Sequence, residues 1–242
     1  MTLQDKVVLI TGAAGMLGGA VCAAVRANGG AVFATDLAAM PGIDAAHDVT
    51  SEDDWRRVCD EIETRHGRLD GLVNNAGIVH VGSVEATELA DFRRVLDINV
   101  SGVFLGCKHA WALLKKSTAA SIVNVSSTAG LVGSANHAAY TASKGAVRIL
   151  SKSVALHGAK LDPPIRCNSL HPSLMEGNMA NILVAGAADP QAAIRAIAES
   201  RTPLRRTADP REVAESVVFL LSDRSSFMTG AELICDGGAT AM

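Results

Sequence analysis

The sequence predicts an α/β fold in which about seven parallel strands form one doubly wound sheet with helices on both faces. Short runs rich in β-branched residues alternate along the chain with longer segments of helical apolar periodicity. That alternation is typical of strand–helix–strand units, whose strands pair in parallel and whose helices cover the sheet. A glycine-rich turn at residues 12–18 separates the first strand from the first helix. It favours the same class because doubly wound sheets commonly begin with such a turn.

Each element is predicted from its local pattern. Strands are expected where apolar and β-branched residues stand together before a turn signal, at residues 7–10, 31–35, 69–73, 121–126, 165–170 and 231–235, with a short strand leading into residues 47–49. Helices are expected where apolar residues recur every three or four positions, at residues 17–25, 52–66, 92–114, 138–157 and 210–221. Asn28-Gly29-Gly30 supplies the stop signal of the first helix.

The segment after the sixth strand, residues 173–206, is the least regular part of the chain and carries an apolar cluster that includes Ile182 and Val184. A long segment at the carboxyl end of a strand more often covers a ligand than it forms a passive loop. We therefore expect a substrate lid there, in preference to an extra helix packed on the body. No repeat or linker divides the chain, so residues 1–242 are expected to form a single domain.

Composition narrows the classes of protein that the chain can be. The net charge is −3 and no block of Lys or Arg is present, which argues against a nucleic-acid partner because phosphate contacts need clustered cations. Hydrophobic residues make up 48% of the chain and charged residues 19%, which excludes a disordered protein. No apolar run is long enough to span a membrane, and no signal-peptide pattern is present. The five cysteines contain no CxxC pair, and we expect reduced thiols in a cytoplasmic protein without a metal site.

The glycine turn and the acid after the second strand predict a dinucleotide cofactor. Glycines let backbone amides approach a pyrophosphate, and the amino end of the following helix favours its negative charge. Asp36 ends the second strand, where a carboxylate accepts hydrogen bonds from both hydroxyls of an adenosine ribose. A 2′-phosphate at that place would be repelled, and no Lys or Arg stands at residues 13, 14 or 37 to offset the repulsion. The expected cofactor is therefore NAD rather than NADP.

Tyr140 is the sole tyrosine, and Lys144 follows it by one helical turn, so both side chains lie on one face of a helix. A phenol is a weak base near neutral pH because its ordinary pKa is about 10. A neighbouring ammonium stabilises the phenolate and lowers that pKa, so such a tyrosine can exchange a proton with an alcohol or carbonyl oxygen. The pair alone is a common surface pattern, but here it opens a helix just after the strand that carries Ser126 and Ser127.

With these motifs in order, the chain resembles the short-chain dehydrogenase/reductase family, with its Rossmann sheet, over essentially its whole length. The motifs that carry the resemblance are the glycine turn from Thr11, Asp48-Val49-Thr50, Asn74-Asn75-Ala76-Gly77, Ile98-Asn99-Val100, Val123-Asn124-Val125-Ser126-Ser127, Tyr140-Thr-Ala-Ser-Lys144, Ile165-Arg-Cys-Asn-Ser-Leu-His-Pro172 and Asp236-Gly-Gly238. Their joint occurrence is far more specific than any single motif. The segments around Asp48 and Pro172 look most like those of bacterial hydroxysteroid and cyclic-alcohol dehydrogenases. Residues 36–48 are few, so a helix usual in the family is expected as a loop there.

The resemblance implies a catalytic set of Asn99, Ser127, Tyr140 and Lys144. Tyr140 would be the general acid and base, Lys144 would bind the nicotinamide ribose and lower the pKa of Tyr140, and Ser127 would hold the substrate oxygen. Ser126 is the alternative to Ser127, but the spacing to Tyr140 favours Ser127. Asn99 would position a water that links Lys144 to solvent. The residues expected to bind NAD are Gly12, Gly15, Met16, Leu17, Gly18, Asp36, Leu37, Asp48, Val49, Asn75, Ala76, Gly77, Tyr140, Lys144, Pro172, Ser173 and Met175.

Two positions depart from the family pattern. Met16 stands where the usual TGxxxGxG turn has its middle glycine, and Gly15 lies one place earlier. Gly177 stands where the family has a threonine that bonds the nicotinamide carboxamide, and Asn178 or Ser173 is the expected substitute. These two departures are expected to affect the affinity of the protein for NAD.

The expected function is the interconversion of a hydrophobic secondary alcohol, hydroxysteroid-like, cyclic or aryl, and its ketone, because the expected lid carries few charges. Ser127, His137, Glu176 and Met179 are the expected substrate contacts. One alternative function is 3-oxoacyl carrier-protein reduction. Asp36 argues against it, because that reaction requires NADPH and Asp36 favours NAD. Another is a nucleotide-sensing or scaffold protein, which the complete catalytic set opposes. The resemblance also implies a homo-oligomer, a tetramer or dimer, formed through the two long helices before and around the tyrosine.

Overall fold

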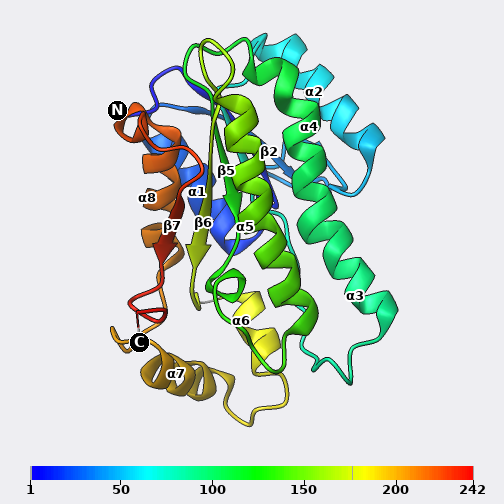
Figure 1. Cartoon of the computed structure of the whole chain (residues 1–242), viewed down its shortest axis with the longest axis vertical. Coiled ribbons are helices and arrows are strands. Elements are labelled where there is room, and N and C mark those ends of the chain that lie inside the picture. The colour runs from blue at the N-terminus through cyan, green and yellow to red at the C-terminus, as the bar shows by residue number, and fades with distance from the viewer. Residues whose placement is uncertain (1, 176, 242) are drawn as a thin grey trace.

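Seven parallel strands form one sheet in the order β3-β2-β1-β4-β5-β6-β7. The structure is a computed structural model that describes residues 2–175 and 177–241, except the side chains of Asn178 and Met179. The strands are β1 (Val7–Thr11), β2 (Ala31–Asp36), β3 (Ala45–Ala46), β4 (Gly71–Asn74), β5 (Ser121–Val125), β6 (Arg166–Pro172) and β7 (Glu232–Cys235). The helices are α1 (Met16–Ala27), α2 (Glu52–His66), α3 (Leu89–Leu96), α4 (Gly102–Leu114), α5 (Ala138–Gly158), α6 (Asn178–Leu183), α7 (Pro190–Arg201) and α8 (Pro210–Leu221). The predicted fold class is confirmed, and Figure 1 shows the sheet with helices around it.

The strand order reverses beside β1, which pairs with β2 on one side and β4 on the other. β1, β4, β5 and β6 are buried along their whole length, because helices cover both faces of a parallel sheet. Ile10 of β1 lies opposite Ala34 of β2 and Val73 of β4. This register sets the glycine turn after β1 beside the loop after β4. Sheets of this kind bind ligands outside the carboxyl ends of their strands, at the point where the order reverses.

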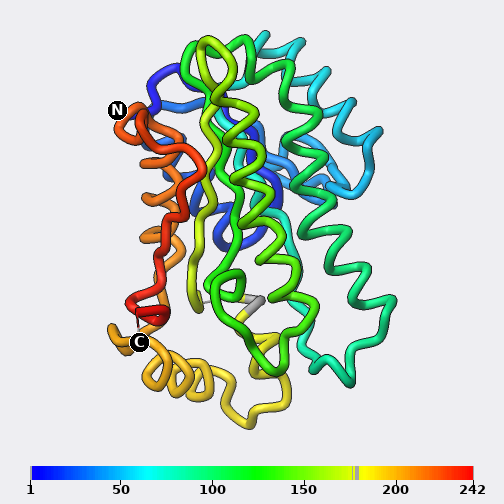
Figure 2. Tube along the Cα trace, viewed as in Figure 1, coloured from blue at the N-terminus to red at the C-terminus, as the bar shows by residue number. Residues whose placement is uncertain are grey.

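Two apolar clusters fill the space between the sheet and its helices. One lies under α1 and α8 and includes Val21 and Val217. The other lies under α2, α4 and α5 and includes Trp55, Val103 and Val147. Figures 1 and 2 show α1 and α8 together on one side of the sheet and α4 and α5 on the other. The burial of both faces explains why the strands read as continuous apolar runs.

Local capping fixes the ends of the helices that were predicted most closely. Ser51 begins α2 by accepting a hydrogen bond from the backbone N–H of Asp54, and Gly67, in a left-handed conformation, ends it. Asp209 and Glu212 form a reciprocal capping box at the start of α8, with Pro210 as its first residue. These signals are visible in the sequence, and the predicted ranges 52–66 and 210–221 agree with α2 and α8.

The predicted continuous helix over residues 92–114 is wrong in one respect. Helical backbone runs from α3 into α4, but the two are joined by a π-helical turn, Asp97–Ser101. Asn99 lies in this turn and is fully buried. Its amide exchanges two hydrogen bonds with the backbone of Ile78, each of 2.9 Å. The wider turn thus directs Asn99 at the loop after β4, and such turns often occur at functional sites.

The predicted lid segment, residues 173–206, contains two helices, α6 and α7. It lies below the carboxyl ends of the strands in Figures 1 and 2. Ala180, Val184 and Ile194 form a small apolar cluster of their own, separate from the two clusters of the body. We keep the name lid for residues 173–206.

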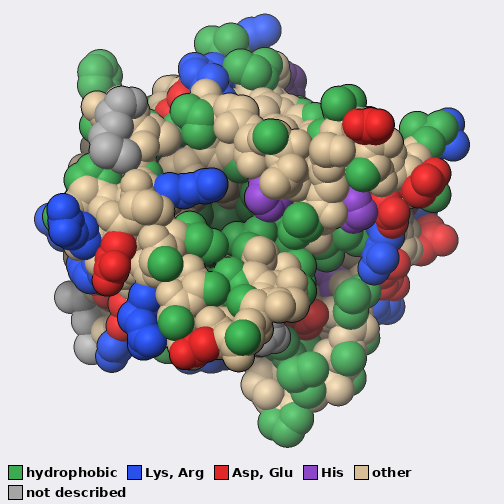
Figure 3. All heavy atoms as spheres, turned by 90° about the horizontal axis from the view of Figure 1, so that it is seen from below, with side chains coloured by type: hydrophobic (Ala, Val, Ile, Leu, Met, Phe, Trp, Pro, Cys, Tyr) green, Lys and Arg blue, Asp and Glu red, His purple; other side chains and the backbone are tan. Residues whose placement is uncertain are grey.

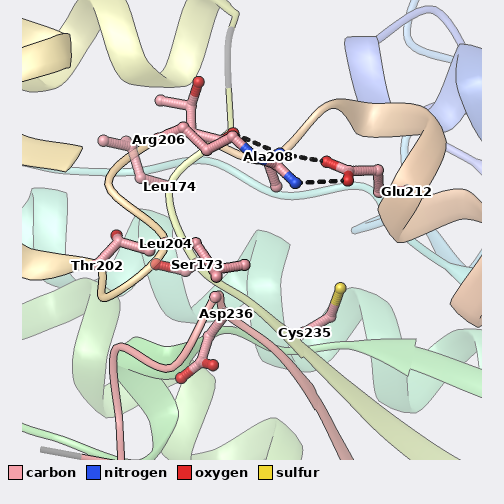
Figure 4. A pocket seen from close by; sticks show the side chains of 11 residues that line it. Ser173, Leu174, Thr202, Leu204, Arg206, Ala208, Glu212, Cys235 and Asp236 are labelled. Carbon is pink, nitrogen blue, oxygen red and sulfur yellow. Dashed lines mark hydrogen bonds and ion pairs between the residues drawn. The ribbon is translucent and has the colours of Figure 1, made fainter. Parts of the chain in front are cut away.

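The base of the lid is tied to the body. The backbone N–H of Ala208 donates to the carbonyl of Leu174 at 3.0 Å, and that of Leu204 donates to Gly237 at 3.2 Å. Figure 4 shows this base, where the Arg206–Glu212 ion pair borders a small cavity of about 100 Å³. The two ends of the lid therefore leave the body side by side.

Candidate active site

The carboxyl ends of the central strands open into a cleft of about 490 Å³, a volume typical of ligand pockets. The glycine turn, the loop after β4, α3 and the start of the lid surround it. The lining residues are Ala14, Gly15, Met16, Gly77, Ile78, Val79, His80, Asp91, Arg94, Val95, Gly177 and Ile182. Figure 3 views this end of the molecule and shows a hollow with hydrophobic side chains inside and His side chains beside it.

Two glycines let the turn after β1 pack directly on the loop after β4. Gly12 has a φ of 65°, and a β-carbon there would lie 2.8 Å from Cα of Ala76. At Gly18, a β-carbon would lie 2.1 Å from the carbonyl oxygen of Gly12. The side-chain amide of Asn75 donates to the carbonyls of Thr11 and Gly12, each at 3.0 Å. The two motifs that were predicted to bind the cofactor therefore form one rigid unit.

The amino end of α1 presents backbone amides that no side chain occupies. Gly15 caps the helix without a side-chain hydrogen bond, and the first turn contains no acidic residue. Such a helix end favours a bound anion. Asp36 lies beside it, where its carboxylate accepts from the backbone N–H groups of Ala14 at 2.9 Å and Leu37 at 2.8 Å. The helix end fits a pyrophosphate and Asp36 fits ribose hydroxyls, so this donor and acceptor set suits a dinucleotide.

α5 brings Tyr140 and Lys144 to the end of β5. Lys144 is 5% exposed, and its ammonium donates to the carbonyl of Val125 at 2.8 Å. The same ammonium lies 5.7 Å from the centroid of the Tyr140 ring. A β-carbon at Gly77 would lie 3.5 Å from it, so Lys144 also borders the loop after β4. Ser127, just after β5, shares a side-chain hydrogen bond with Tyr140.

Burial shifts the pKa values of this pair in opposite directions. It raises the pKa of Tyr140, which the hydrogen bond with Ser127 partly lowers. It also lowers the pKa of Lys144 to about 8. Both shifts arise because a charged group is costly away from water. Strongly shifted titratable groups beside a cleft are typical of functional sites, so the pair is a candidate for proton transfer.

Asn99 connects the catalytic residues to the loop after β4. Besides its bonds to Ile78, its amide donates to the hydroxyl of Ser143 at 3.0 Å. That hydroxyl donates to the backbone carbonyl of Tyr140 at 2.7 Å. Asn99, Ser127, Tyr140 and Lys144, predicted together, thus lie in one connected group of side chains.

The structure separates the two candidate serines. Ser126 is 2% exposed, and its hydroxyl donates to the backbone carbonyl of Lys144 at 2.8 Å. The hydroxyl of Ser127 instead lies beside Tyr140 and 3.4 Å from the carbonyl of Pro172. His171 supports this position, because its Nδ1 lies 3.0 Å from the backbone carbonyl of Ser127.

Several other predicted residues lie away from the cleft. The backbone N–H of Ser173 bonds Cys235, and Ser173 borders the cavity at the lid base. Met175 packs against the apolar cluster under α1 and α8. His137 caps α5, with Nδ1 2.7 Å from the hydroxyl of Ser134. Glu176 and the side chain of Met179 lie outside the described part of the chain, as does the side chain of Asn178.

Asp48 and Val49 follow β3, where Val49 is buried against α4 and Asp48 is exposed. Residues 36–48 contain no helix, as predicted from their number. Leu17 is buried on α1, whereas Leu37 is 72% exposed after β2. None of these four residues lines the cleft.

Sequence reasoning missed residues that only the three-dimensional structure brings to the site. Asp91 and Arg94 line the cleft from α3, and Ser143 and His171 hold Asn99 and Ser127 in place. No motif marks Asp91 or Arg94, and Ser143 and His171 lie within quoted motifs that assign them no role. An i, i+3 position relative to Tyr140 was the one signal that could have indicated Ser143.

Two absences apply to the residues that the structure describes. None of their helices is long and apolar enough to cross a membrane. No group of three or more of their His, Cys, Asp and Glu side chains could hold a metal ion.

Comparison with known proteins places the chain in a family. A family model described as Enoyl-(Acyl carrier protein) reductase matches residues 12–240. The cyclopentanol dehydrogenase of Comamonas sp. is 40% identical, over 99% of this chain and 98% of that one. The 3-alpha-(or 20-beta)-hydroxysteroid dehydrogenase of Mycobacterium tuberculosis is 39% identical, over 99% and 91%. An NADP-dependent (R)-specific alcohol dehydrogenase of Lentilactobacillus kefiri is 36% identical, over 99% and 98%.

A solved structure gives the same result for the fold. The ligand-free aldohexose dehydrogenase of Thermoplasma acidophilum is 32% identical and superposes with a TM-score of 0.91, over 99% of this chain and 95% of that one. With the cleft, the glycine turn and the Tyr140–Lys144 pair in place, the chain belongs to the short-chain dehydrogenase/reductase family.

Proposed function

We propose that the protein is an NAD-dependent oxidoreductase that interconverts a hydrophobic secondary alcohol and its ketone. The observation that carries the proposal is the group of Asn99, Ser127, Tyr140 and Lys144, in which Ser143 links Asn99 to the Tyr140 backbone, near a cleft of about 490 Å³. The relatives named as cyclopentanol and hydroxysteroid dehydrogenases support the alcohol class, because cyclopentanol and the 3-alpha- and 20-beta-hydroxysteroids are secondary alcohols.

In the direction of alcohol oxidation, Tyr140 acts as the base. Ser127 holds the substrate hydroxyl, whose O–H bond breaks as its proton passes to the phenolate oxygen of Tyr140. The C–H bond breaks with its electron pair, and the carbon–oxygen double bond forms. The oxidised nicotinamide, when bound, supplies the acceptor for that hydride. In the opposite direction, Tyr140 returns its proton to the ketone oxygen.

Lys144 and Asn99 prepare Tyr140 for this role. The ammonium of Lys144, 5.7 Å from the ring centroid, stabilises the phenolate. Its place beside Gly77 also suits a hydrogen bond to the nicotinamide ribose. Asn99 fixes the loop after β4 against α5, and a water held near it would carry protons from Lys144 to solvent.

Asp36 supports NAD as the cofactor. Its carboxylate is fixed by two backbone N–H groups at the edge of the glycine turn. There it can accept hydrogen bonds from ribose hydroxyls and would repel a 2′-phosphate. One relative is named as NADP-dependent, so the cofactor preference is a direct test of the proposal.

The test is a spectrophotometric assay of reduced nicotinamide with NAD and with NADP. Cyclic, steroid and aryl secondary alcohols form the substrate panel, and primary alcohols serve as controls. The proposal expects turnover of a cyclic or steroid alcohol with NAD and at least about tenfold lower kcat/KM with NADP. Preference for NADPH and a 3-oxoacyl carrier-protein substrate would instead favour the acyl reductase. Tight NAD binding without turnover of any substrate would favour a sensor.

We further propose a homo-oligomer built on α4 and α5, in the cytoplasm. Phe104 on α4 and Ile149 and Leu156 on α5 are exposed apolar side chains, and exposed apolar groups of this kind mark interaction surfaces. Light scattering on the purified protein should give a dimer or tetramer, and Ile149→Glu should lower the mass. A monomer in the unchanged protein would refute the oligomer.

A further inference from the structure

The two positions at which the chain departs from its family's pattern touch each other. Met16 is the first residue of α1, and Gly177 precedes α6 at the start of the lid. A β-carbon built on Gly177 would lie 2.9 Å from Cε, 3.0 Å from Cγ and 3.4 Å from Sδ of Met16. These distances are shorter than ordinary van der Waals contacts, so the Met16 side chain fills the space that any larger residue at 177 would need.

The backbone at Gly177 is also restricted to glycine. Its φ of 131° and ψ of −173° lie in a region that residues with a β-carbon rarely enter. Gly177 therefore brings the lid backbone close to α1, and the thioether of Met16 provides the contact. A flexible, polarizable methionine is well suited to such an irregular space.

The contact lies on the cleft itself. Met16, Gly177 and Ile182 all line it, and both Met16 and Ile182 remain about half exposed, at 50% and 49%. The lid has an apolar cluster of its own, separate from the two clusters of the body. Met16 is the first residue of α1, so the contact lies at the amino end of this helix, which suits the pyrophosphate. The contact therefore joins the lid to the helix end that suits the pyrophosphate.

We infer that Met16 is a latch that retains the nicotinamide cofactor by closing against Gly177 of the lid. This apolar contact takes the place of the hydrogen bond to the nicotinamide carboxamide that a threonine at position 177 would make. The inference rests on the proposed cofactor but not on the substrate or on Tyr140. It makes Met16 a positioning residue for the lid and a determinant of the cofactor dissociation rate.

The first experiment measures NADH release from the full chain by stopped-flow fluorescence, without substrate. Met16→Ala should release NADH about tenfold faster, because it removes the apolar contact that holds the lid. Phe227→Ala is the control, because Phe227 is fully exposed and precedes β7, at the amino end of that strand. Unchanged release from Met16→Ala would overturn the latch.

The second experiment separates the contact from backbone strain. Gly177→Ala adds both strain and overlap with Met16, whereas Gly186→Ala adds strain alone, since Gly186 has a φ of 94° and no atom lies within 4 Å of its β-carbon position. Gly177→Ala should weaken NADH binding more than Gly186→Ala. Because Met16→Gly and Gly177→Ala disrupt the same contact, the loss in the double variant should be smaller than the sum of the two single losses, and a strictly additive result would overturn the inference.

The outcomes distinguish the latch from the proposed function. Faster NADH release with no turnover of any alcohol would keep the latch and refute the dehydrogenase. Normal turnover with unchanged release would do the reverse. Circular dichroism and the unfolding midpoint of each variant ensure that a folded protein is compared, and Met16→Leu, which preserves the apolar contact, should release NADH within about threefold of the unchanged chain.

Discussion

The charge of Lys144 should control the pKa of Tyr140, and the chain offers an unusually direct way to measure it. Tyr140 is the only tyrosine, so the ultraviolet absorbance of tyrosinate reports on this residue alone. Lys144→Met removes the ammonium and keeps a side chain of similar length. The pKa of Tyr140 should rise, because a positive neighbour stabilises the phenolate and its loss removes that stabilisation.

The size of the shift follows from the geometry. At 5.7 Å from the ring centroid, a unit charge contributes about 3 kcal/mol with an effective dielectric constant of about 20. That energy corresponds to about two pKa units. Lys144 is 5% exposed, so solvent screens little of it. Its own pKa of about 8 in the cofactor-free protein means that its charge is present at neutral pH.

The assay is a pH titration of tyrosinate absorbance in the NAD complex, with rapid pH jumps that precede unfolding. Lys152→Met, four residues from Arg148 on the same helix and paired with Glu232, is the matched control. The acid limb of kcat/KM for alcohol oxidation should move to higher pH by the same two units, which lowers oxidation at pH 7 about a hundredfold. An acid limb of kcat/KM at the same pH in the Lys144→Met variant and the unchanged protein would refute this reasoning, because that limb is measured near neutral pH, where Lys144 still carries its charge.

Three further predictions follow from the same site and its support. Asp36→Ser should lower kcat/KM with NAD about tenfold to a hundredfold and raise it with NADP; unchanged preference would show that Asp36 does not select the cofactor. Ser127→Ala should lower kcat about a hundredfold and leave the unfolding free energy nearly unchanged. Ser126→Ala should instead lower the unfolding free energy by about 1 kcal/mol and change kcat by no more than a few-fold. The reverse pattern would exchange the roles of the two serines. Burial lowers the pKa of His47 from 6.5 to about 4, so as the pH falls the unfolded chain binds a proton at this residue before the folded chain does. Up to about 3 kcal/mol of unfolding free energy should therefore be lost as the pH falls from 6.5 to 4. His47→Gln should remove this loss from denaturant unfolding curves, and an unchanged pH dependence would contradict it.

Local signals explain the parts of the fold that could be predicted from the sequence. Ser51 and Gly67 mark the ends of α2, and Asp209 with Glu212 marks the start of α8. These caps act between residues close in the chain, so their chemistry can be recognised without a structure. Strands such as β1 and β5 were predictable because burial on both faces makes them nearly continuous apolar runs.

Long-range contacts explain what the sequence did not predict. The π-helical turn at Asp97–Ser101 leaves the apolar periodicity almost intact, and its cause is the hydrogen bonding of Asn99 with Ile78. Met16 and Gly177 each read as an isolated departure from a motif, yet they form one contact between segments far apart in the chain. The contact of His171 with the Ser127 carbonyl depends on the pairing of β5 with β6.

The central claim is that Tyr140 transfers the proton in a nicotinamide-dependent alcohol oxidation. The most direct test is a single-turnover measurement of NADH formation, with saturating NAD and the best alcohol of the panel, in the unchanged protein and in Tyr140→Phe. NADH binding, measured by fluorescence, verifies that the variant keeps its cleft. The account predicts that the rate falls at least about a hundredfold while NADH still binds. A Tyr140→Phe rate within about threefold of the unchanged protein would contradict it.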